Sequence, residues 1–208
     1  MFYIDILTGE INMFYHGTNV GGLKILTPSK SNQGEFVYFS DNKLNIFPYL
    51  ANPCQVVLDK KYGKGVKHIH YRIAQYSFTP EGKLVLVDIW PNYLKDTFKG
   101  QTGYIYYFKN IDGIKKLEGM DNIYGLDRPI EVENVEVIPD IYEEIVKLNK
   151  EGLVELVFYE DMKQEKRDMF SKRFLETYKK TENPLVKEVL FDKFKMIQDY
   201  ENSLKEKL

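Results

Sequence analysis

The chain has 208 residues, of which 43% are apolar and 29% are charged, and its formal net charge is −2. These values fit one globular domain, with or without a helical appendage, and they exclude a disordered or fibrous chain. A net charge so near zero gives no global positive field, so neither nucleic acid nor an anionic membrane is indicated as a partner, although a local basic cleft stays compatible with it.

The cysteine count and the hydropathy pattern favour a cytoplasmic protein. Cys54 is the single cysteine, which excludes an internal disulfide and a cysteine-rich zinc site. No apolar run approaches the roughly 20 residues that span a bilayer. The opening residues carry neither a basic segment nor a small-residue cleavage site. We therefore expect no membrane partner.

The first quarter of the chain is predicted to contain short strands separated by turns. Residues 2–7 ("FYIDIL") are β-prone, and "MFYHGT" and "EFVYFS" are two further apolar runs. Between them, "GGLKILTPSK" is expected to form a short helix or turn that ends at Pro28. Asp41 can cap a helix over 42–51, which Pro48 would kink or shorten.

The middle of the chain has the pattern of a sheet. Apolar and aromatic strands are predicted at 71–78, 83–90 and 103–110, and "PIEVENVEVI" is predicted to be one strand with a solvated acidic face. A helix over 138–152 has Asp140 as its cap and Gly152 as its stop. A short strand, "LVELVFYED", follows.

The C-terminal residues are helical in periodicity and highly charged. A break at Asn183–Pro184 predicts two helices there. We accordingly expect one domain over residues 1–160, in which 1–12 form an extension, and a helical segment over 161–208 that packs on it.

Two features near the N-terminus could carry chemistry. His16 and Gly17 stand at the end of a predicted strand, where a side chain can project into a cleft and a ligand can approach the backbone. Tyr38 lies in a strand and Tyr49 follows eleven positions later, so two aromatic faces could clamp a flat ring. Taken singly, each residue is more often a hydrogen-bonded or packed structural group.

Together, "FYHGT", "VYFS" and the later tyrosine resemble the NAD-binding half of ADP-ribosyltransferases. The resemblance covers roughly residues 14–50 and is to the histidine-tyrosine-glutamate branch, which includes diphtheria toxin and the poly(ADP-ribose) polymerases. The motifs also look like those of rifampicin ADP-ribosyltransferases. This resemblance implies an α+β fold with a split, bent antiparallel β-sheet core, edge helices and a C-terminal helical pair.

The resemblance also implies roles for individual residues, with NAD as co-substrate. His16 and Thr18 would bind the adenosine-side ribose, and the backbone of Gly17 would hold the nicotinamide carboxamide. Tyr38, also expected to be catalytic, and Tyr49 would sandwich the nicotinamide ring. Contacts to the pyrophosphate could come from surface lysines, namely Lys24, Lys30 and Lys43.

The family also requires a carboxylate near the nicotinamide ribose, and here the sequence departs from the pattern. Arg128 precedes Pro129 where an acid might be expected, which leaves Glu131, Asp127 and Asp112 as candidates. The alternation in "PIEVENVEV" also fits a solvated strand face. A second departure is Ile46, which stands where the polymerases have a serine.

The function implied is mono-ADP-ribosyl transfer, or NAD glycohydrolysis, with an unidentified acceptor that could be a protein, a nucleic acid or a small molecule. One alternative is a catalytically inactive module that binds NAD or ADP-ribose. Another is an interaction domain whose C-terminal helices dock a partner.

Other constellations are weaker. His68 and His70 have a spacing that metal sites use but lack a further ligand. Cys54 is a further candidate nucleophile, in a context that looks like the end of a helix, but nothing beside it suggests a partner histidine. The glycine spacing fits neither a phosphate loop nor a dinucleotide fingerprint. The basic residues that tRNA 2′-phosphotransferases use for RNA are not evident.

Overall fold

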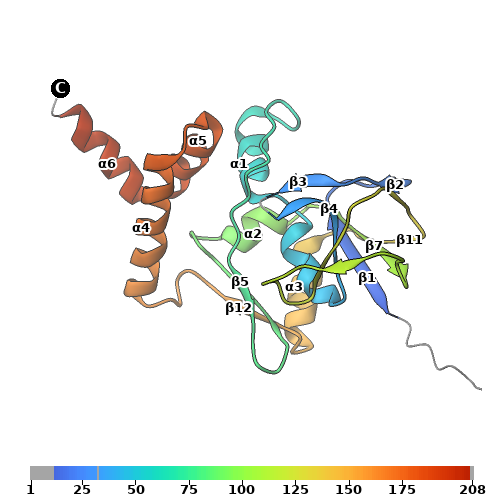
Figure 1. The fold of residues 1–208 in the computed structure, drawn as a ribbon. Helices are drawn as coiled ribbons and strands as arrows, with labels where there is room; N and C mark the ends of the chain where they lie inside the picture. Colours follow the sequence, from blue (N-terminus) through green and yellow to red (C-terminus); the bar gives the residue numbers. More distant parts are fainter. Residues whose placement is uncertain (1–11, 32, 207–208) are drawn as a thin grey trace, which may run out of the picture. The chain divides into compact units, whose positions relative to one another are not determined.

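The computed structural model describes residues 12–31 and 33–206, so the strand predicted at 2–7 lies outside the described residues. The chain forms two compact units (Figure 1). Unit 1 comprises Met1–Leu50 and Gly103–Ile138, and unit 2 comprises Ala51–Thr102 and Pro139–Leu208. The boundary expected at residue 160 falls inside unit 2. Sequence periodicity identifies elements but does not show that the chain leaves a unit and returns to it.

Unit 1 is built on a seven-stranded sheet with the order β11-β7-β1-β4-β9-β8, to which β3 adds through β4. Every pairing in it is antiparallel, which confirms the expected α+β class with antiparallel sheets. The strands are β1 (Met13–Thr18), β3 (Ser29–Ser31), β4 (Gly34–Ser40), β7 (Gly103–Lys109), β8 (Lys115–Lys116), β9 (Ile123–Leu126) and β11 (Asn134–Ile138).

The junction between β1 and β4 is the feature that shapes the site. β1 pairs with β7 along all of Met13–Thr18, but with β4 only at Tyr15 opposite Ser40. On its other side β4 pairs with β9 over Val37–Ser40. The two halves of the sheet are therefore joined at one register position, and the ladder is interrupted beyond it.

Two predicted elements of unit 1 are wrong. "GGLKILTPSK" forms no helix but contains the strand β2 (Ile25–Leu26), which pairs with β10 (Ile130–Glu131). "PIEVENVEVI" is not one strand, because β10 and β11 belong to different sheets. A two-residue strand is too short to show alternation, so its tertiary partner decides its structure.

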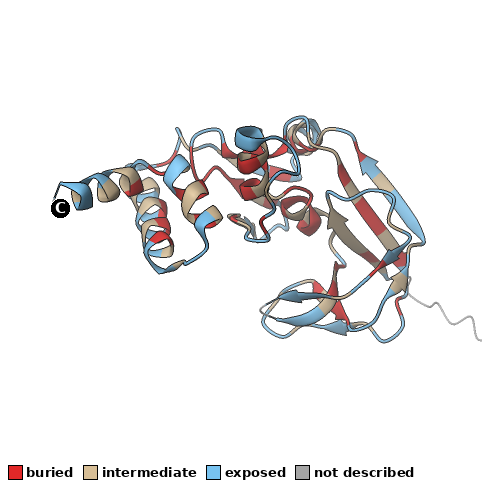
Figure 2. Cartoon of the chain, turned by 90° about the horizontal axis from the view of Figure 1, so that it is seen from above, coloured by how far each residue is buried: buried red, intermediate tan, exposed pale blue. Residues whose placement is uncertain are grey.

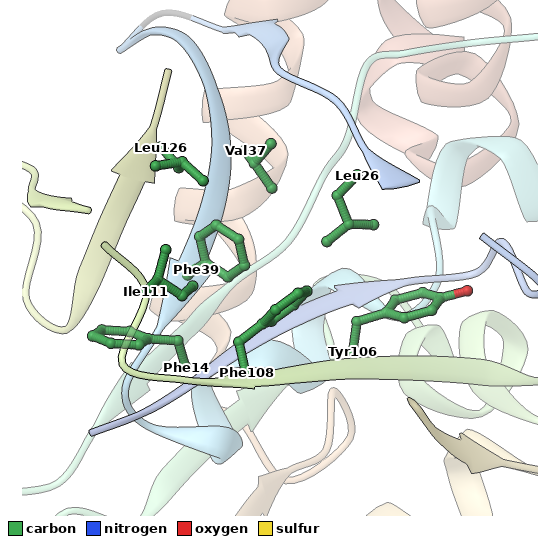
Figure 3. Close-up of a cluster of buried hydrophobic side chains, with 8 residues drawn as sticks. All are labelled: Phe14, Leu26, Val37, Phe39, Tyr106, Phe108, Ile111 and Leu126. Carbon is green, nitrogen blue, oxygen red and sulfur yellow. The ribbon is translucent and has the colours of Figure 1, made fainter. Parts of the chain in front are cut away.

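The core of unit 1 lies on the face of the sheet that carries Phe14 and Phe39 (Figure 3). Their rings pack with that of Phe108, and the Phe39 and Phe108 centroids are 5.3 Å apart in an edge-to-face pair. The cluster consists of Phe14, Leu26, Val37, Phe39, Tyr106, Phe108, Ile111 and Leu126. These residues alternate along their strands, which is why the sequence shows them as strand-like.

The helix predicted over 42–51 is the 3₁₀-helix η1 (Lys43–Tyr49). Its cap is Asn42, whose side chain accepts a hydrogen bond from the Leu44 amide, whereas the predicted cap Asp41 accepts one from the Tyr124 hydroxyl at 2.8 Å. Pro48 lies inside η1, as expected.

Unit 2 combines helices with a three-stranded sheet of order β12-β6-β5. Its strands are β5 (Tyr76–Phe78), β6 (Leu84–Val87) and β12 (Val154–Val157), and the β12–β6 pair is parallel. The helices α1 (Pro53–Tyr62), α2 (Tyr93–Phe98) and α3 (Ile141–Lys150) accompany this sheet. Asp140 caps α3, as predicted.

The C-terminal pair of helices is in fact three helices, α4 (Gln164–Lys180), α5 (Pro184–Lys193) and α6 (Lys195–Lys205). Asn183 caps α5 ahead of Pro184, which confirms the predicted break. A second break occurs at Phe194, whose extended backbone lets its ring stack on Phe174 at 4.7 Å. Each of the three helices has a few buried residues among a larger number of exposed or half-buried ones (Figure 2). Within the described residues, no helix has both the length and the apolar character needed to cross a membrane.

Candidate functional site

A pocket of about 200 Å³ lies in unit 1, at the interrupted junction of β1 and β4. Two predicted residues come from each wall: His16 and Gly17 from β1, and Tyr38 from β4 with Tyr49 from η1. The remaining lining residues are apolar: Phe39, Ile46, Met120 and Ile123. Of the five residues expected to bind the ribose or the nicotinamide of NAD, four line this pocket, and the fifth, Thr18, does not.

His16 bridges the gap between the two diverging strands. Its Nδ1 lies 2.8 Å from the Tyr38 carbonyl oxygen, which can only accept, so Nδ1 carries the proton. Burial lowers the pKa of His16, and the hydrogen bond to Tyr38 opposes this in part. The imidazole is therefore neutral near pH 7, and its Nε2 is an acceptor.

Tyr38 is held from the β3–β4 hairpin. Its hydroxyl donates to the Gly34 carbonyl at 3.0 Å and is hydrogen-bonded to the Ser31 hydroxyl. The rings of Phe36 and Tyr38 form an edge-to-face pair, with centroids 6.0 Å apart and an interplanar angle of 87°. These three contacts fix the orientation of the ring that lines the pocket.

Gly17 is required by the approach of η1. A Cβ atom on Gly17 would lie 2.0 Å from Ile46 Cγ2 and 3.2 Å from the Ile46 carbonyl oxygen, so a side chain there would displace η1. On this side of Gly17, η1 of the same chain makes the close approach that was expected of a ligand. This approach brings Ile46 and Tyr49 of η1 to the pocket.

An ion pair ties η1 to the sheet. The Lys43 ammonium lies 2.7 Å from the Glu136 carboxylate on β11, and both side chains are about two-fifths exposed. Glu136 is opposite Ile105 in β7, and Ile105 is opposite Gly17 in β1. Lys43, expected at a pyrophosphate, is therefore already paired. Lys24 and Lys30 are exposed and do not line the pocket.

Thr18 and the candidate acids are not among the lining residues. The Thr18 hydroxyl accepts a hydrogen bond from the Val20 amide at 3.2 Å. Asp127 forms an exposed ion pair with Lys115 at 3.2 Å. Glu131 is exposed on β10, and Asp112 is exposed beside Arg128, at 3.8 Å.

Sequence reasoning missed the segment before β9. Met120 and Ile123 line the pocket, and they flank Asp121 and Asn122. Asn122 has a φ of 58°, a left-handed conformation that asparagine tolerates, and it lies directly before β9. β9, the four-residue strand that follows, shows no marked alternation of apolar and polar residues. The sequence therefore gives no signal for this wall of the pocket.

The competing constellations find no support in unit 2. Cys54 is buried at the start of α1, not at the end of a helix, and burial raises the pKa of its thiol to about 12. A thiol with that pKa is a poor nucleophile. Within residues 12–31 and 33–206, no group of three or more histidine, cysteine or carboxylate side chains could hold a metal.

Comparison of the chain with protein-family models, curated proteins and solved structures found no match in any of the three.

Proposed function

We propose that unit 1 binds NAD and cleaves its nicotinamide–ribose bond, as an ADP-ribosyltransferase or NAD glycohydrolase of the histidine-tyrosine-glutamate type. The observation that carries this proposal is the convergence of His16, Gly17, Tyr38 and Tyr49 on one pocket. They come from three elements, and the pocket lies where the sheet divides. A divided antiparallel sheet is also the architecture that the resemblance implies.

The chemistry of the pocket suits one end of NAD. Its walls are largely apolar and aromatic, and its volume of about 200 Å³ is below the roughly 300–1,000 Å³ typical of sites that enclose a whole ligand. A nicotinamide ring would enter between Tyr38 and Tyr49, and the rest of the dinucleotide would extend outside. The neutral His16 would accept a hydrogen bond from a ribose hydroxyl.

The reaction would break the bond between the nicotinamide nitrogen and ribose C1′, with both electrons leaving on nicotinamide. Positive charge then develops on the ribose, and water or a nucleophilic acceptor attacks C1′ and loses a proton. Clamping the ring and excluding water would help to orient the bond. A carboxylate near the ribose would stabilise the developing charge.

Asp121 joins Asp127, Glu131 and Asp112 as a candidate for that carboxylate. It is exposed, and its neighbour Met120 and the nearby Ile123 both line the pocket. Asp127 and Asp112 do not adjoin a residue that lines the pocket. Asp127 is instead paired with Lys115, and Asp112 with Arg128. We rank Asp121 first for this reason.

The alternative function is an inactive module that binds NAD or ADP-ribose. The observation that favours it is that none of the described residues lining the pocket is acidic. Binding without turnover would follow if Asp121 did not reach the ribose.

Calorimetric titration with NAD, followed by measurement of nicotinamide release, tests both functions. NAD binding with nicotinamide release supports the enzyme. NAD binding without nicotinamide release, whichever acceptor is added, supports the module. Absence of binding contradicts both. If nicotinamide is released, Asp121→Asn should lower the rate by about 10²–10³-fold at nearly unchanged NAD affinity. Asp127→Asn, Glu131→Gln and Asp112→Asn are the matched variants, and the carboxylate whose loss lowers the rate is the acid.

A further inference from the structure

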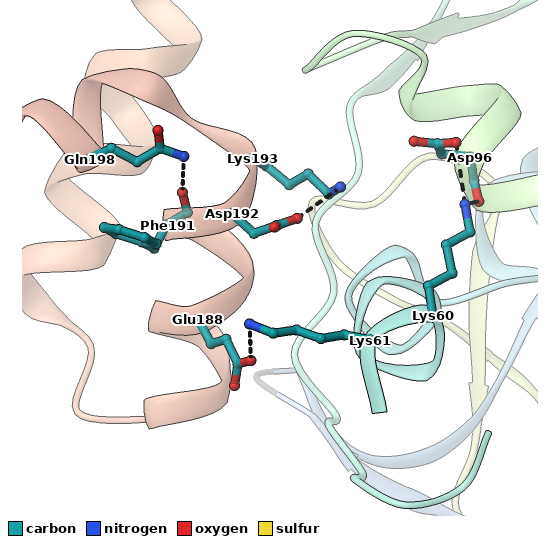
Figure 4. A network of polar contacts seen from close by, with 8 residues as sticks. All are labelled: Lys60, Lys61, Asp96, Glu188, Phe191, Asp192, Lys193 and Gln198. Atoms are coloured by element: carbon teal, nitrogen blue, oxygen red, sulfur yellow. Dashed lines mark hydrogen bonds and ion pairs between the residues drawn. The ribbon is translucent and has the colours of Figure 1, made fainter. Parts of the chain in front are cut away.

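Charged side chains on the surface of unit 2 are paired with one another. Figure 4 shows α1 linked in this way to two other helices, by Lys60 with Asp96 of α2 and by Lys61 with Glu188 of α5. These charges neutralise one another, and they indicate no ligand. A free surface of a different kind lies in unit 1, at one edge of its sheet.

The path of strands in the sheet of unit 1 ends at β11 on one side and at β8 on the other. β8 is two residues long and consists of lysines, which discourage a further strand from pairing. β11 is five residues long, and its Val135 and Val137 are 45% and 51% exposed. A longer, apolar edge of this kind is a template for one more strand.

The two valines extend the face of the sheet that carries the core. Val135 is opposite Tyr106 and Val137 is opposite Tyr104 in β7. Residues directly opposite each other in an antiparallel pair have their side chains on the same face, and Tyr106 belongs to the core cluster. The core face therefore ends in two half-exposed branched side chains, which a further strand would cover.

The small size of this edge indicates what kind of strand could pair with it. Five residues with two valines offer far less surface than the roughly 1,200 Å² that a specific interface between separate proteins buries. A strand tethered to the same sheet needs much less, because a short tether supplies an effective concentration in the millimolar range. The occupant should therefore come from this chain, from a segment tethered near β11.

Residues 2–7 ("FYIDIL"), which lie outside the described residues, meet this condition. Asn12 is fixed beside the end of β7, because it accepts the Asn110 amide and donates to the Asn110 side chain, both at 3.0 Å. β1 and β11 begin at this same end of the sheet, opposite Lys109 and Tyr107 of β7. A strand beyond β11 would lie three strand spacings from β1, about 14 Å, and the five linking residues reach roughly 16 Å.

We propose that residues 2–7 pair with the free edge of β11, antiparallel to it. The direction follows from the tether, since the segment must finish at the end of the sheet where β1 and β11 begin. Alternation in "FYIDIL" puts Phe2, Ile4 and Ile6 on one face, where they would cover the two valines, and Asp5 on the other. The proposal does not rest on NAD binding by unit 1.

Amide hydrogen exchange of β11, followed residue by residue by NMR, tests the proposal. Alternate amides of an edge strand point away from its neighbour, so a further strand would protect those of β11. We expect these amides to exchange at least about tenfold more slowly in the parent than in the double variant Ile4→Asp with Ile6→Asp. Asp5→Asn, on the opposite face, is the matched control and should keep the parent rates. Thermal unfolding shows whether each variant is folded.

Pairs of introduced cysteines test the position of the segment independently. Ile4→Cys combined with Val135→Cys, or with Val137→Cys, should form a disulfide within one chain in at least one of the two registers. Ile4→Cys combined with Lys116→Cys, at the β8 edge, is the control and should not. Cys54 does not compete, because it is buried and the pKa of its thiol is raised to about 12.

Two results overturn the proposal directly: parent exchange rates equal to those of the double aspartate variant, and cross-linking at β8 as fast as at β11. Protection that rises with protein concentration between about 20 and 500 μM, or disulfides between chains, would assign the edge to a second copy of the chain. Residues 2–7 would then not be its occupant.

Discussion

At the scale of single residues, the site is defined by which hydrogen bonds are already made. His16 uses Nδ1 to satisfy the Tyr38 carbonyl where the β1–β4 ladder is interrupted. The side chain thereby takes the place of a backbone donor, which is a structural role, and it leaves Nε2 for a ligand. The structural and functional interpretations of this histidine are therefore compatible.

The protonation state of His16 should control NAD binding. Burial lowers the pKa of His16 below its ordinary value near 6.5, so Nε2 is an acceptor at pH 7 and becomes a donor only as pH falls through that lowered pKa. Affinity measured calorimetrically from pH 8 to 5 should stay level above pH 6.5 and fall below the folded-state pKa.

In the same titration, His16→Ala should lose about 0.5–1.5 kcal/mol of binding free energy at pH 7, the usual net value of one hydrogen bond. It should also lose the pH dependence. The exposed His70 provides the control, since His70→Ala should keep the parent profile. A parent affinity that already falls above pH 6.5, or an unchanged affinity of His16→Ala at pH 7, would contradict the role given to Nε2.

Tyr38 allows the ring to be separated from its hydroxyl. Tyr38→Ala should weaken NAD binding by about 1–3 kcal/mol if the ring supplies one stacked face. Tyr38→Phe keeps the ring but loses the bonds to Ser31 and Gly34, so its loss should be smaller, about 0.5–1.5 kcal/mol. Equal affinity of both folded variants and the parent would remove Tyr38 from the clamp, and Tyr49→Ala then tests the other face.

At the scale of elements, the position of η1 decides the shape of the pocket. Two contacts set that position: the close packing of Ile46 on Gly17 and the ion pair of Lys43 with Glu136. An ion pair exposed to this degree is worth little by itself, about 0–1 kcal/mol. The packing on Gly17 is therefore the stronger constraint.

Gly17→Ala should displace η1 and so affect both stability and binding. The added Cβ has no space beside Ile46 and Leu50, and overpacking of this kind costs roughly 1–3 kcal/mol. Chemical unfolding and NAD titration measure the two effects. Ile46→Ala removes the clashing Cγ2, so it should cost less in the Gly17→Ala background than in the parent. Strictly additive costs would show that η1 does not pack on Gly17 in this way.

The elements that sequence predicts are those whose signals are local. β1, β4 and β7 have long apolar or aromatic runs, and the caps Asp140 and Asn183 stand directly before their helices. β2 and β10, two residues each, exist because they pair across about a hundred residues. The parallel pairing of β12 with β6 likewise depends on tertiary contact and has no sequence signature.

The same division holds for the pocket. His16, Gly17, Tyr38 and Tyr49 lie within one stretch of about 35 residues and form a recognisable order. Met120 and Ile123 come from about seventy residues further on and belong to no motif. For that reason the sequence drew attention to acids near residue 131 and not to Asp121, which is the neighbour of Met120.

At the scale of the whole molecule, the chain alternates between its two units. It leaves unit 1 after Leu50, returns at Gly103 and leaves again after Ile138. The pocket needs both segments of unit 1, so it cannot be complete until contacts distant in sequence have formed. Pairings such as β1 with β7, about ninety residues apart, make slow folding the expectation.

The pH dependence of stability is also a property of the whole chain, and two buried groups contribute to it with opposite signs. The lowered pKa of His16 means that the unfolded chain binds the proton more tightly, so stability rises with pH up to about 6.5. Asp88 acts in the other direction. Only 2% of it is exposed, and burial raises the pKa of its carboxyl to about 6 from an ordinary value of 3.8.

Asp88 nevertheless has a local role, because its Oδ1 accepts the Leu94 amide at 2.6 Å and so caps α2, whose own N-cap residue Asn92 makes no side-chain hydrogen bond. Asparagine can provide the same acceptor without the charge. Asp88→Asn should therefore keep α2 capped and remove only the cost of burying a carboxylate.

Between about pH 4 and 6 the folded chain holds a proton on Asp88 that the unfolded chain has released, so the parent loses stability as pH rises through this window. The free energy of unfolding of Asp88→Asn, measured by urea titration, should equal that of the parent near pH 4. At pH 7 it should exceed the parent's by up to about 3 kcal/mol, the value of a shift of this size. Asp161→Asn, at an exposed position of the same unit, should follow the parent throughout. If the difference between Asp88→Asn and the parent does not change between pH 4 and 7, the carboxylate is not destabilised by burial; if Asp88→Asn is less stable at every pH, the capping hydrogen bond requires the charge.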